Sequence, residues 1–308
     1  MTFRALNSQN IRRFAFFDRK IGHGACNMNM KQLFGILMAC ASIFYFLEAL
    51  TTTTPLNAQP RHDDTDASYT SCLKETLRNL PINKDGQVKA HHWDARNEQW
   101  NENIRLAPMP RLQQEPCSVW EVGANTRAQD TQRLRSMYPL CEYHAYEPIS
   151  DFFKELTDNW RQDGAGNANV HLHNYALAKE NGTIYFPKSN LAGESTYIGD
   201  GSKLSDSTND VDSASVRSFH FAIQDAGGNK PTLLHMNCEG CEWDLLRDAL
   251  DTSFIDNVPL IQIGFHNYGH VGLGERVIEY CDIQMKLART HNLVHGAVPF
   301  AWERWELK

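Results

Sequence analysis

The stretch CSVWEVGANTR, residues 117–127, predicts a β-strand that ends in a tight glycine turn. Valine and tryptophan side chains between 119 and 122 favour the strand, Glu121 places an acid near its C-terminal end, and Gly123 favours the turn. Residues 128–137 then favour a helix. In a doubly wound α/β sheet, the turn after the first strand lies beside nucleotide-like ligands, because its backbone N–H groups can approach them. We therefore expect a ligand site at the end of this strand.

Short apolar runs alternate with helical segments along the rest of the chain, which implies right-handed βαβ units and a mostly parallel sheet. The expected strands are 119–122, 143–146, 170–176, 232–236 and 260–265. The expected helices are 71–80, 95–106, 129–137, 150–160, 242–250 and 275–291. Residues 183–186 are expected to form one arm of a hairpin, 293–307 a final antiparallel pair, and 189–215 a long loop near the site.

The size and charge of the chain set limits on its class. A length of 308 residues permits one large domain or two small ones with a full core. The formal net charge of -7 and the pI of about 6.0 argue against a nucleic-acid partner, because such proteins normally carry a basic face.

An apolar run at residues 33–47, LFGILMACASIFYFL, predicts a membrane anchor. It is shorter than the roughly 20 residues of a typical span, but the thin bilayers of the early secretory pathway accept shorter spans. Basic residues precede it, so the cytosolic side is expected to hold the N-terminus. We expect a single-pass type II protein of the Golgi or endoplasmic reticulum membrane, with a tail at 1–32, a signal anchor at 33–50, a disordered stem at 51–70 and a lumenal domain at 71–308, its core at 117–308. A cleaved signal peptide and a secreted protein are the alternative.

Six cysteines follow the predicted anchor, an even number that permits disulfides in an oxidising lumen, although the sequence does not determine their pairing. They are Cys72, Cys117, Cys141, Cys238, Cys241 and Cys281. Asn181 begins the N-glycosylation sequon Asn-Gly-Thr, and Asn-Gly also favours a hairpin turn. Both interpretations place Asn181 on the surface.

A second acid, Glu147, follows the strand expected at 143–146. An acid at the end of the second strand of a nucleotide-binding sheet can accept hydrogen bonds from two neighbouring ribose hydroxyls. The alternative is a surface glutamate before a helix that Ser150 caps.

Four motifs occur in an order and spacing that resemble those of FkbM-type methyltransferases. They are VWEVGAN at 119–125, HAYEP at 144–148, HNYALAKENGTIYF at 173–186 and LLHMNCEGCEWDLL at 233–246. The family pattern has D-x-G-A-N-x-G, F-E-P, N-x-A-L and K-x-D-x-E-G-x-E at these places. The resemblance covers residues 118–266, about half of the chain. It implies a Rossmann-like seven-stranded methyltransferase sheet, S-adenosylmethionine as cofactor, and methyl transfer to hydroxyl groups.

Carried over by position, the resemblance implies three groups of cofactor-binding residues: Glu121 with Gly123, Ala124 and Asn125 at the methionine end, Glu147 on the ribose hydroxyls, and Asn174 with Ala176 near the adenine. Asn237, Glu239 and Glu242 are expected on the acceptor side. The acceptor itself is expected to be a small molecule, a glycan or a lipid, and no metal is expected.

A hydroxyl acceptor needs a base or an electrostatic device as its proton leaves. The catalytic candidates are His235, Glu239 and His266. Each has a structural alternative, since a histidine at a strand end is commonly a hydrogen-bonded core residue and Glu239 is placed to cap the following helix.

The sequence departs from the family pattern at several positions. Arg127 replaces the last glycine of the turn, which adds bulk and would be strained at a positive φ. His235 and Asn237 stand where the family has Lys and Asp, and Gly264 stands where it usually has Glu. These departures indicate a specialised acceptor site or a lost activity, so a catalytically silent binding module is the first alternative function.

Two other hypotheses use different residues. Asp210-Val211-Asp212 is a D-x-D of the type by which Golgi glycosyltransferases hold a metal-bound sugar nucleotide. His235, Cys238 and Cys241 are a candidate for part of a zinc site, with a disulfide or free buried thiols as the alternative for the cysteines.

Overall fold

The computed structural model describes residues 63–80, 105–114, 116–162, 169–187, 211–266, 273–296 and 299–308, all of which belong to one compact unit, His62–Lys308. The predicted tail and anchor and most of the predicted stem lie outside these residues, as does most of the helix expected at 95–106. Within the described ranges, no helix has the length and apolar character that crossing a membrane requires.

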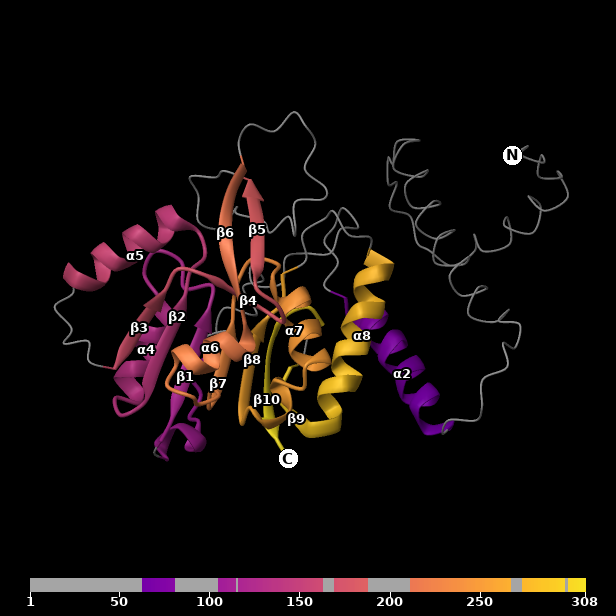
Figure 1. The fold of residues 1–308 in the computed structure, drawn as a ribbon. Helices are drawn as coiled ribbons and strands as arrows, with labels where there is room; N and C mark the ends of the chain where they lie inside the picture. Colours follow the sequence, from indigo (N-terminus) through magenta and orange to yellow (C-terminus); the bar gives the residue numbers. More distant parts are fainter. Residues whose placement is uncertain are drawn as a thin grey trace, which may run out of the picture. The chain divides into compact units, whose positions relative to one another are not determined.

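Strands and helices alternate along the unit (Figure 1). The strands are β1 (Ser118–Val122), β2 (Glu142–Tyr146), β3 (Val170–His173), β4 (Ala176–Ala178), β5 (Gly182–Pro187), β6 (Val211–Ser218), β7 (Leu233–Met236), β8 (Leu260–Gly264), β9 (His291–His295) and β10 (Trp302–Leu307). The helices are α2 (Asp63–Asn79), α4 (Gln129–Met137), α5 (Ser150–Gln162), α6 (Phe219–Asp225), α7 (Glu242–Asp251) and α8 (Leu273–Thr290), with 3-10 turns η3 (Pro110–Gln113) and η4 (Ile255–Asn257).

Seven strands form the main sheet in the order β3-β2-β1-β7-β8-β10-β9. The first five pair in parallel, and β10 lies antiparallel between β8 and β9. This is a Rossmann-like α/β fold with a mostly parallel seven-stranded sheet and a C-terminal antiparallel hairpin, which confirms this part of the predicted fold class. The order reverses between β1 and β7, the place where open α/β sheets bind their ligands.

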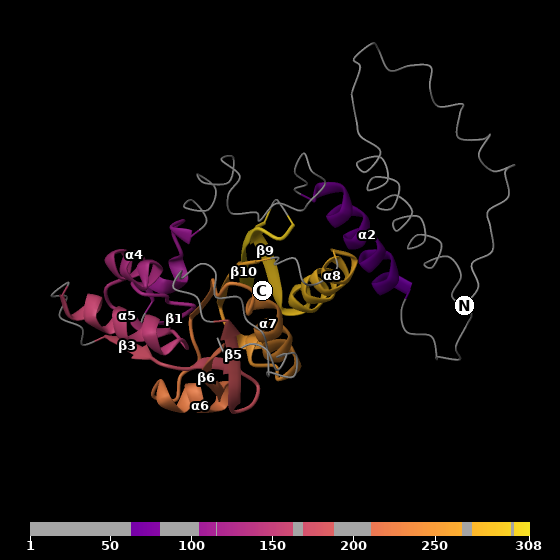
Figure 2. The ribbon, with the colours of Figure 1, turned by 90° about the horizontal axis from the view of Figure 1, so that it is seen from above.

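The strands of the main sheet carry apolar side chains on both of its faces, and helices therefore cover both faces. Val119, Tyr143 and Leu233 pack in one core with α4 and α5, whereas Trp120 and Leu234 pack in the other with α6, α7 and α8. Figure 2 shows α4 and α6 on opposite sides of β1. Strands buried on both faces read as nearly continuous apolar runs. This is why these strands could be found in the sequence.

A second sheet of three strands, in the order β4-β6-β5, stands beside the carboxyl ends of the main strands (Figure 1). The expected strand at 170–176 is wrong in its last part, because the chain breaks after β3 and begins β4 at Ala176. The arm expected at 183–186 exists as β5, and its antiparallel partner is β6 rather than a strand before the Asn-Gly turn. The loop expected at 189–215 is likewise wrong at its end, where 211–215 belong to β6.

Three disulfides join the six cysteines: Cys72–Cys281, Cys117–Cys141 and Cys238–Cys241. The first fastens α2 to α8, and the second joins the starts of β1 and β2. Helix α2 begins at Asp63, so the end of the predicted disordered stem, residues 63–70, is helical instead. Its apolar side packs on the main core through Leu73, which explains why this segment is ordered.

Candidate functional site

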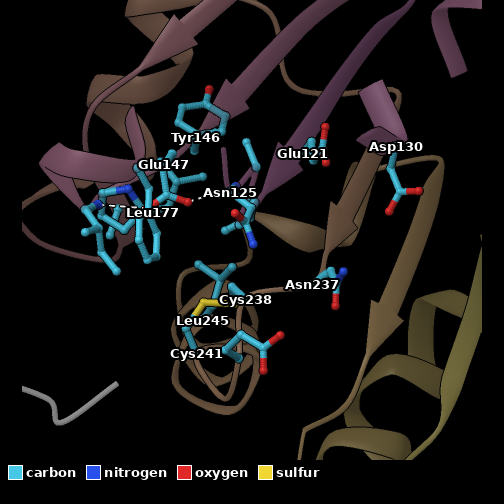
Figure 3. A pocket seen from close by; sticks show the side chains of 18 of the residues that line it. Glu121, Asn125, Asp130, Tyr146, Glu147, Leu177, Asn237, Cys238, Cys241 and Leu245 are labelled. Atoms are coloured by element: carbon cyan, nitrogen blue, oxygen red, sulfur yellow. Dashed lines mark hydrogen bonds between the residues drawn. A yellow bond between two sulfur atoms is a disulfide. The ribbon is translucent and has the colours of Figure 1, made fainter. Parts of the chain in front are cut away.

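A cavity of about 410 Å³ lies at the carboxyl ends of β1, β2 and β7, beside the second sheet (Figure 3). Its wall is formed by the glycine turn after β1, the residues that follow β2, the turn between β7 and α7, and one side of β4 and β6. The volume is within the range of roughly 300–1,000 Å³ that small-molecule and cofactor sites occupy. A cavity therefore lies at the end of β1, where the ligand site was predicted.

Gly123 is required by the way the turn after β1 meets the turn after β7. Its φ is +89°, and a Cβ atom at this position would lie 2.2 Å from the carbonyl oxygen of Asn237. The N–H groups of Gly123 and Ala124 donate to the carbonyl oxygen of Tyr146, at 3.1 and 3.0 Å. The expectation that these N–H groups approach the ligand is wrong, because they hold the end of β2 instead.

Positive φ angles in the turn fall on Asn125 (56°) and Ala128 (45°), not on Arg127. The predicted backbone strain at Arg127 is therefore wrong. Arg127 is exposed, and it lines the cavity as expected. The residue that tolerates left-handed backbone best among these is Asn125, and its N–H donates to Glu147.

Glu147 joins the first turn to the end of β2. Its Oε2 accepts from the N–H of Asn125 at 2.9 Å, and its Oε1 accepts from the N–H of Ile149 at 2.8 Å. The residue is 4% exposed and lines the cavity. Burial raises the pKa of Glu147 to about 7, although the two N–H groups act against the shift. Since each carboxylate oxygen has a second lone pair, Glu147 can still accept from ligand hydroxyls.

Glu121 also lines the cavity, and it fixes the start of α4 by accepting from the N–H of Thr131 at 2.8 Å. Its neighbour is Asp130, another lining residue. Burial and the charge of Asp130 together raise the pKa of Glu121 to about 7, against the opposing effect of His235. The pKa of Asp130 is lowered instead, because His235 and Arg105 lie beside it, so Asp130 stays ionised at a pH where Glu121 takes up a proton.

Asp130 accepts from two cationic side chains. Arg105 Nη1 donates to its two oxygens at 3.1 and 3.0 Å, and His235 Nε2 lies 3.0 Å from Oδ2. Burial alone would raise the pKa of Asp130, but His235 and Arg105 lower it to about 2. Sequence reasoning missed Asp130 and Arg105. The sequence held one signal for Asp130, its position in the first turn of the helix after the glycine turn, and none for Arg105.

His235 is a core residue rather than a cavity residue. It is 0% exposed, is absent from the described lining, and its Nδ1 faces Gln262 Oε1 at 3.0 Å. Burial lowers the pKa of His235, but Asp130 and Glu121 more than offset this and raise it. The prediction of His235 as a catalytic base is therefore wrong, because His235 is fully buried and its two ring nitrogens are occupied by Asp130 and Gln262.

The acceptor-side candidates and the remaining catalytic candidate, His266, have different positions. Glu239 lines the cavity, as does Asn237, whereas Glu242 and His266 are buried behind them. Glu242 accepts from the N–H groups of Cys238 and Gly240 at 2.8 and 2.9 Å, so its expected place facing the acceptor is wrong.

His266 lies between two carboxylates. Its Nδ1 is 2.6 Å from Glu242 Oε1, and its Nε2 is 3.8 Å from Glu239 Oε2. Burial lowers the pKa of His266, but Glu242 and Glu239 more than compensate and raise it. Burial also raises the pKa of Glu239. Glu239 is thus the one catalytic candidate of the three that faces the cavity, and His266 contacts it from behind.

Of the two residues expected near the adenine, one lines the cavity and the other does not. Ala176 lines the cavity with Leu177 and Val216 of the second sheet. Asn174 does not line it but donates through Nδ2 to the carbonyl oxygens of Glu147 and Pro148, at 2.9 and 3.2 Å. Asn174 therefore positions the loop that carries Glu147.

The zinc hypothesis is contradicted by the geometry. Cys238 and Cys241 form a disulfide, and His235 points to Asp130 and Gln262 instead. No group of side chains in the described ranges could hold a metal ion. Of the D-x-D motif, Asp210 lies outside the described residues, and Asp212 pairs with Phe186 in the second sheet without lining the cavity.

Asn181 is exposed just before β5, where the sequon was expected on the surface. Its Oδ1 accepts from the N–H of Ser218 at 2.9 Å. Whether a glycan is attached stays a prediction.

Acidic side chains dominate the charge of the cavity. Six lining residues carry carboxyl groups, namely Glu121, Asp130, Glu147, Glu239, Asp244 and Asp248, whereas two, Arg105 and Arg127, carry guanidinium groups. An excess of carboxylates favours a cationic ligand and disfavours an anionic one such as a free nucleotide sugar. Apolar groups from Phe152, Leu177 and Ile184 complete the wall.

Searches with protein-family models and of curated proteins find no match. Among solved structures, the chain is similar to the methyltransferase FkbM of Methylobacillus flagellatus, with a TM-score of 0.41 and 14% identity over 77% of this chain and 58% of that one. It is also similar to an SAH-bound methyltransferase of Podospora anserina (TM-score 0.38, 8% identity, 93% and 100% coverage). A third is CalS11, a TDP-rhamnose 3'-O-methyltransferase of calicheamicin biosynthesis (TM-score 0.38, 10% identity, 82% and 99% coverage).

Proposed function

We propose that this protein is an S-adenosylmethionine-dependent methyltransferase that methylates a hydroxyl group. The observation that carries the proposal is the anionic cavity over the glycine turn, with Glu147 in its wall at the end of β2. An acid at this place in the fold suits ribose hydroxyls, and the excess of carboxylates suits a sulfonium and an ammonium group. The apolar side formed with the second sheet suits an adenine ring.

The residues present fit this cofactor. Glu147 has unused lone pairs, since each of its oxygens accepts one backbone N–H. Gly123 lets the turns after β1 and β7 meet at the cavity wall, and the side chain of Ala176 in the same wall is small. S-adenosylmethionine would supply a methyl group that its sulfonium already activates. The protein then has to align the acceptor, exclude water and accept a proton.

Glu239 is the residue best placed to accept the acceptor's proton. It faces the cavity, and its raised pKa brings its basicity closer to neutral pH. His266 lies behind it, with Nδ1 2.6 Å from Glu242 Oε1 and Nε2 3.8 Å from Glu239 Oε2, so it can hold the carboxylate of Glu239 in place before the proton arrives. His266 therefore acts as a positioning residue, because it does not reach the cavity itself.

A catalytically silent binding module is the second candidate. The specific observation in its favour is Asn237, which lines the cavity where the resembled family carries an Asp. An amide retains hydrogen bonding but not charge. Cofactor binding without methyl transfer to any of a panel of hydroxylated glycans, lipids and small molecules would favour this alternative.

The secretory location is also part of the proposal. The three disulfides of the described unit support an oxidising compartment, since such bonds are rare in the cytosol. The predicted anchor at 33–50 would hold the protein in the Golgi or endoplasmic reticulum membrane. Protease protection in microsomes, read together with the glycosylation of Asn181, tests this location: a domain digested in intact vesicles and unglycosylated would contradict it.

Replacing Glu147 by Gln is expected to weaken S-adenosylmethionine binding about 10- to 100-fold, the equivalent of the ~1.5–3 kcal/mol that a hydrogen bond to a charged group contributes. Calorimetry of the purified full chain measures the affinity. The matched control is Glu142→Gln, at the exposed opposite end of the same strand, which should bind like the unaltered protein. No binding by the folded, unaltered chain would contradict the proposed function, and equal binding by both variants would contradict this placement of the cofactor.

The affinity is expected to rise with pH between about 5.5 and about 7.5, by about tenfold or more. Glu121 and Glu147 have pKa values of about 7 in the free protein, so both carry protons at the lower pH. A cationic ligand prefers the ionised carboxylates, and binding therefore releases protons below pH 7. Calorimetry in two buffers of different ionisation enthalpy measures this release. An affinity that falls with pH over this interval would show that these carboxyl groups do not face the cation.

A further inference from the structure

The Cys238–Cys241 disulfide differs from the other two in its place and its surroundings. It lies in the wall of the cavity, and both of its cysteines are partly exposed (Figure 3). In each of the other pairs at least one cysteine, Cys141 or Cys281, is fully buried. Its partners are 3 residues apart in sequence, compared with 24 and 209. A bond that closes so short a loop removes little chain entropy, so it contributes least to the stability of the fold.

The turn that this disulfide closes is held in an unusual backbone conformation. Glu239 has a φ of 55° and Gly240 a φ of 103°. Three contacts hold the turn: the disulfide, the hydrogen bond from the N–H of Cys241 to the carbonyl oxygen of Cys238 at 3.3 Å, and the carboxylate of Glu242, which accepts from the N–H groups of Cys238 and Gly240. A left-handed glutamate is unfavourable without such support. Opening the disulfide therefore leaves Glu239, the cavity's proposed base, in a turn that hydrogen bonds hold without the covalent link.

The same turn presses on the glycine turn after β1. A Cβ atom on Gly123 would lie 2.2 Å from the carbonyl oxygen of Asn237 and 2.8 Å from the Cα of Cys238. No space remains between the two turns, so a change in the backbone at Cys238 must alter the wall of the cavity. The disulfide is thus mechanically coupled to the ligand site.

We propose that Cys238 and Cys241 form an exchangeable redox site, which a dithiol reductant opens and whose opening weakens binding in the cavity. This deepens the proposed function and rests on it for the identity of the ligand. The chemical class of the reacting partner is a small dithiol or a dithiol protein, which reaches the sulfur atoms from the cavity side.

The exchange balances with the dithiol as reductant. Its thiolate attacks Cys238 Sγ, forming a mixed disulfide and breaking the bond to Cys241 Sγ, which leaves as a thiolate and takes a proton. The second thiol of the reductant, as a thiolate, then attacks the other sulfur of the reductant, which is bonded to Cys238 in the mixed disulfide. This step expels Cys238 as a thiolate, which is protonated in turn. The protein pair gains two electrons and two protons, and the dithiol becomes a cyclic or protein disulfide. Cys241 directly precedes α7, and the start of a helix stabilises a departing thiolate.

The first test follows which cysteines open. The purified full chain is titrated with dithiothreitol, and free thiols are alkylated and located by mass spectrometry. Cys238 and Cys241 are expected to be alkylated at lower reductant than Cys117 and Cys141. Simultaneous opening of both pairs, or earlier opening of Cys117–Cys141, would overturn the proposal.

The second test measures what the opening does. S-adenosylmethionine affinity in the selectively reduced chain is expected to fall about tenfold, equivalent to ~1.4 kcal/mol. The double variant Cys238→Ser/Cys241→Ser should bind as weakly as the reduced chain and should not respond to reductant. Equal affinity in the oxidised and reduced chains would overturn the proposal.

A cofactor-independent measurement separates this proposal from the proposed function. Hydrogen exchange at the N–H groups of Cys238 and Gly240 is expected to become faster on selective reduction. Without the disulfide, the turn opens more often and breaks the hydrogen bonds from these groups to Glu242. Faster exchange in a chain that binds no S-adenosylmethionine would contradict the methyltransferase and leave the redox site supported. Unchanged exchange would contradict the coupling whatever the ligand.

Discussion

The Gly123→Ala variant is expected to lose about 3 kcal/mol or more of its free energy of unfolding and to bind no cofactor. Two effects add at this residue. A left-handed φ costs an L-residue about 1–2 kcal/mol, and overpacking against rigid atoms costs about 1–3 kcal/mol more. Here φ is +89°, and the new Cβ would lie 2.2 Å from the carbonyl oxygen of Asn237, a backbone atom that cannot rotate away. The two turns must separate, and the cavity between β1 and β7 changes shape.

Gly228→Ala is the matched control for this prediction. Gly228 has nearly the same backbone conformation, with a φ of +92°, but nothing lies within 4 Å of the place of its Cβ atom. Its substitution is expected to cost only the conformational part, about 1–2 kcal/mol, with cofactor binding retained. Urea unfolding of both variants therefore isolates the effect of the contact. Equal losses in the two variants would show that the turns after β1 and β7 are not in tight contact.

The Asp130→Asn variant is expected to lose about 3–5 kcal/mol, the effect of removing one partner from a buried ion pair. The loss is large because Arg105 and His235 both donate to this carboxylate, and His235 is fully buried. An amide has one acceptor oxygen in place of two and carries no charge. The fully buried His235 and the partly exposed Arg105 would then share a single neutral acceptor.

Asp151→Asn is the matched control, because Asp151 occupies the second position of α5 as Asp130 occupies that of α4. It is exposed, so only the helix-dipole contribution of a few tenths of a kcal/mol is lost. A loss at Asp130 no larger than that at Asp151 would contradict the buried network.

The dependence of the Asp130→Asn effect on pH gives a second readout. The pKa of Asp130 is lowered to about 2 in the fold, so its contribution is complete above about pH 4 and is lost as the pH falls through 2. The pKa of His235 is raised, so its contribution is complete below 6.5 and is lost as the pH rises through the folded value. The difference in stability between the two proteins is therefore expected to be largest between about pH 4 and pH 6.5.

The sequence by itself indicated the parallel strands of the main sheet and the place of the ligand site, but not β6 or α6. Strands such as Leu260–Gly264 are continuous apolar runs, and the glycine turn after residue 122 has its own local signature. These patterns depend on neighbours within a few residues, so they can be read directly. The acids at the ends of β1 and β2 could be found for the same reason, since parallel strands bring their carboxyl ends to one edge.

Only the tertiary structure decided which polar residues face the cavity. Glu239 and His266 were equal candidates in sequence, but one lines the cavity and the other is buried behind it. The partners of Asp130 lie 25 residues before it and 105 residues after it, and the disulfide Cys72–Cys281 spans 209. Side-chain direction and partners depend on packing between distant segments. A chain read in order therefore indicates where the site is, and only packing determines which of its residues can act.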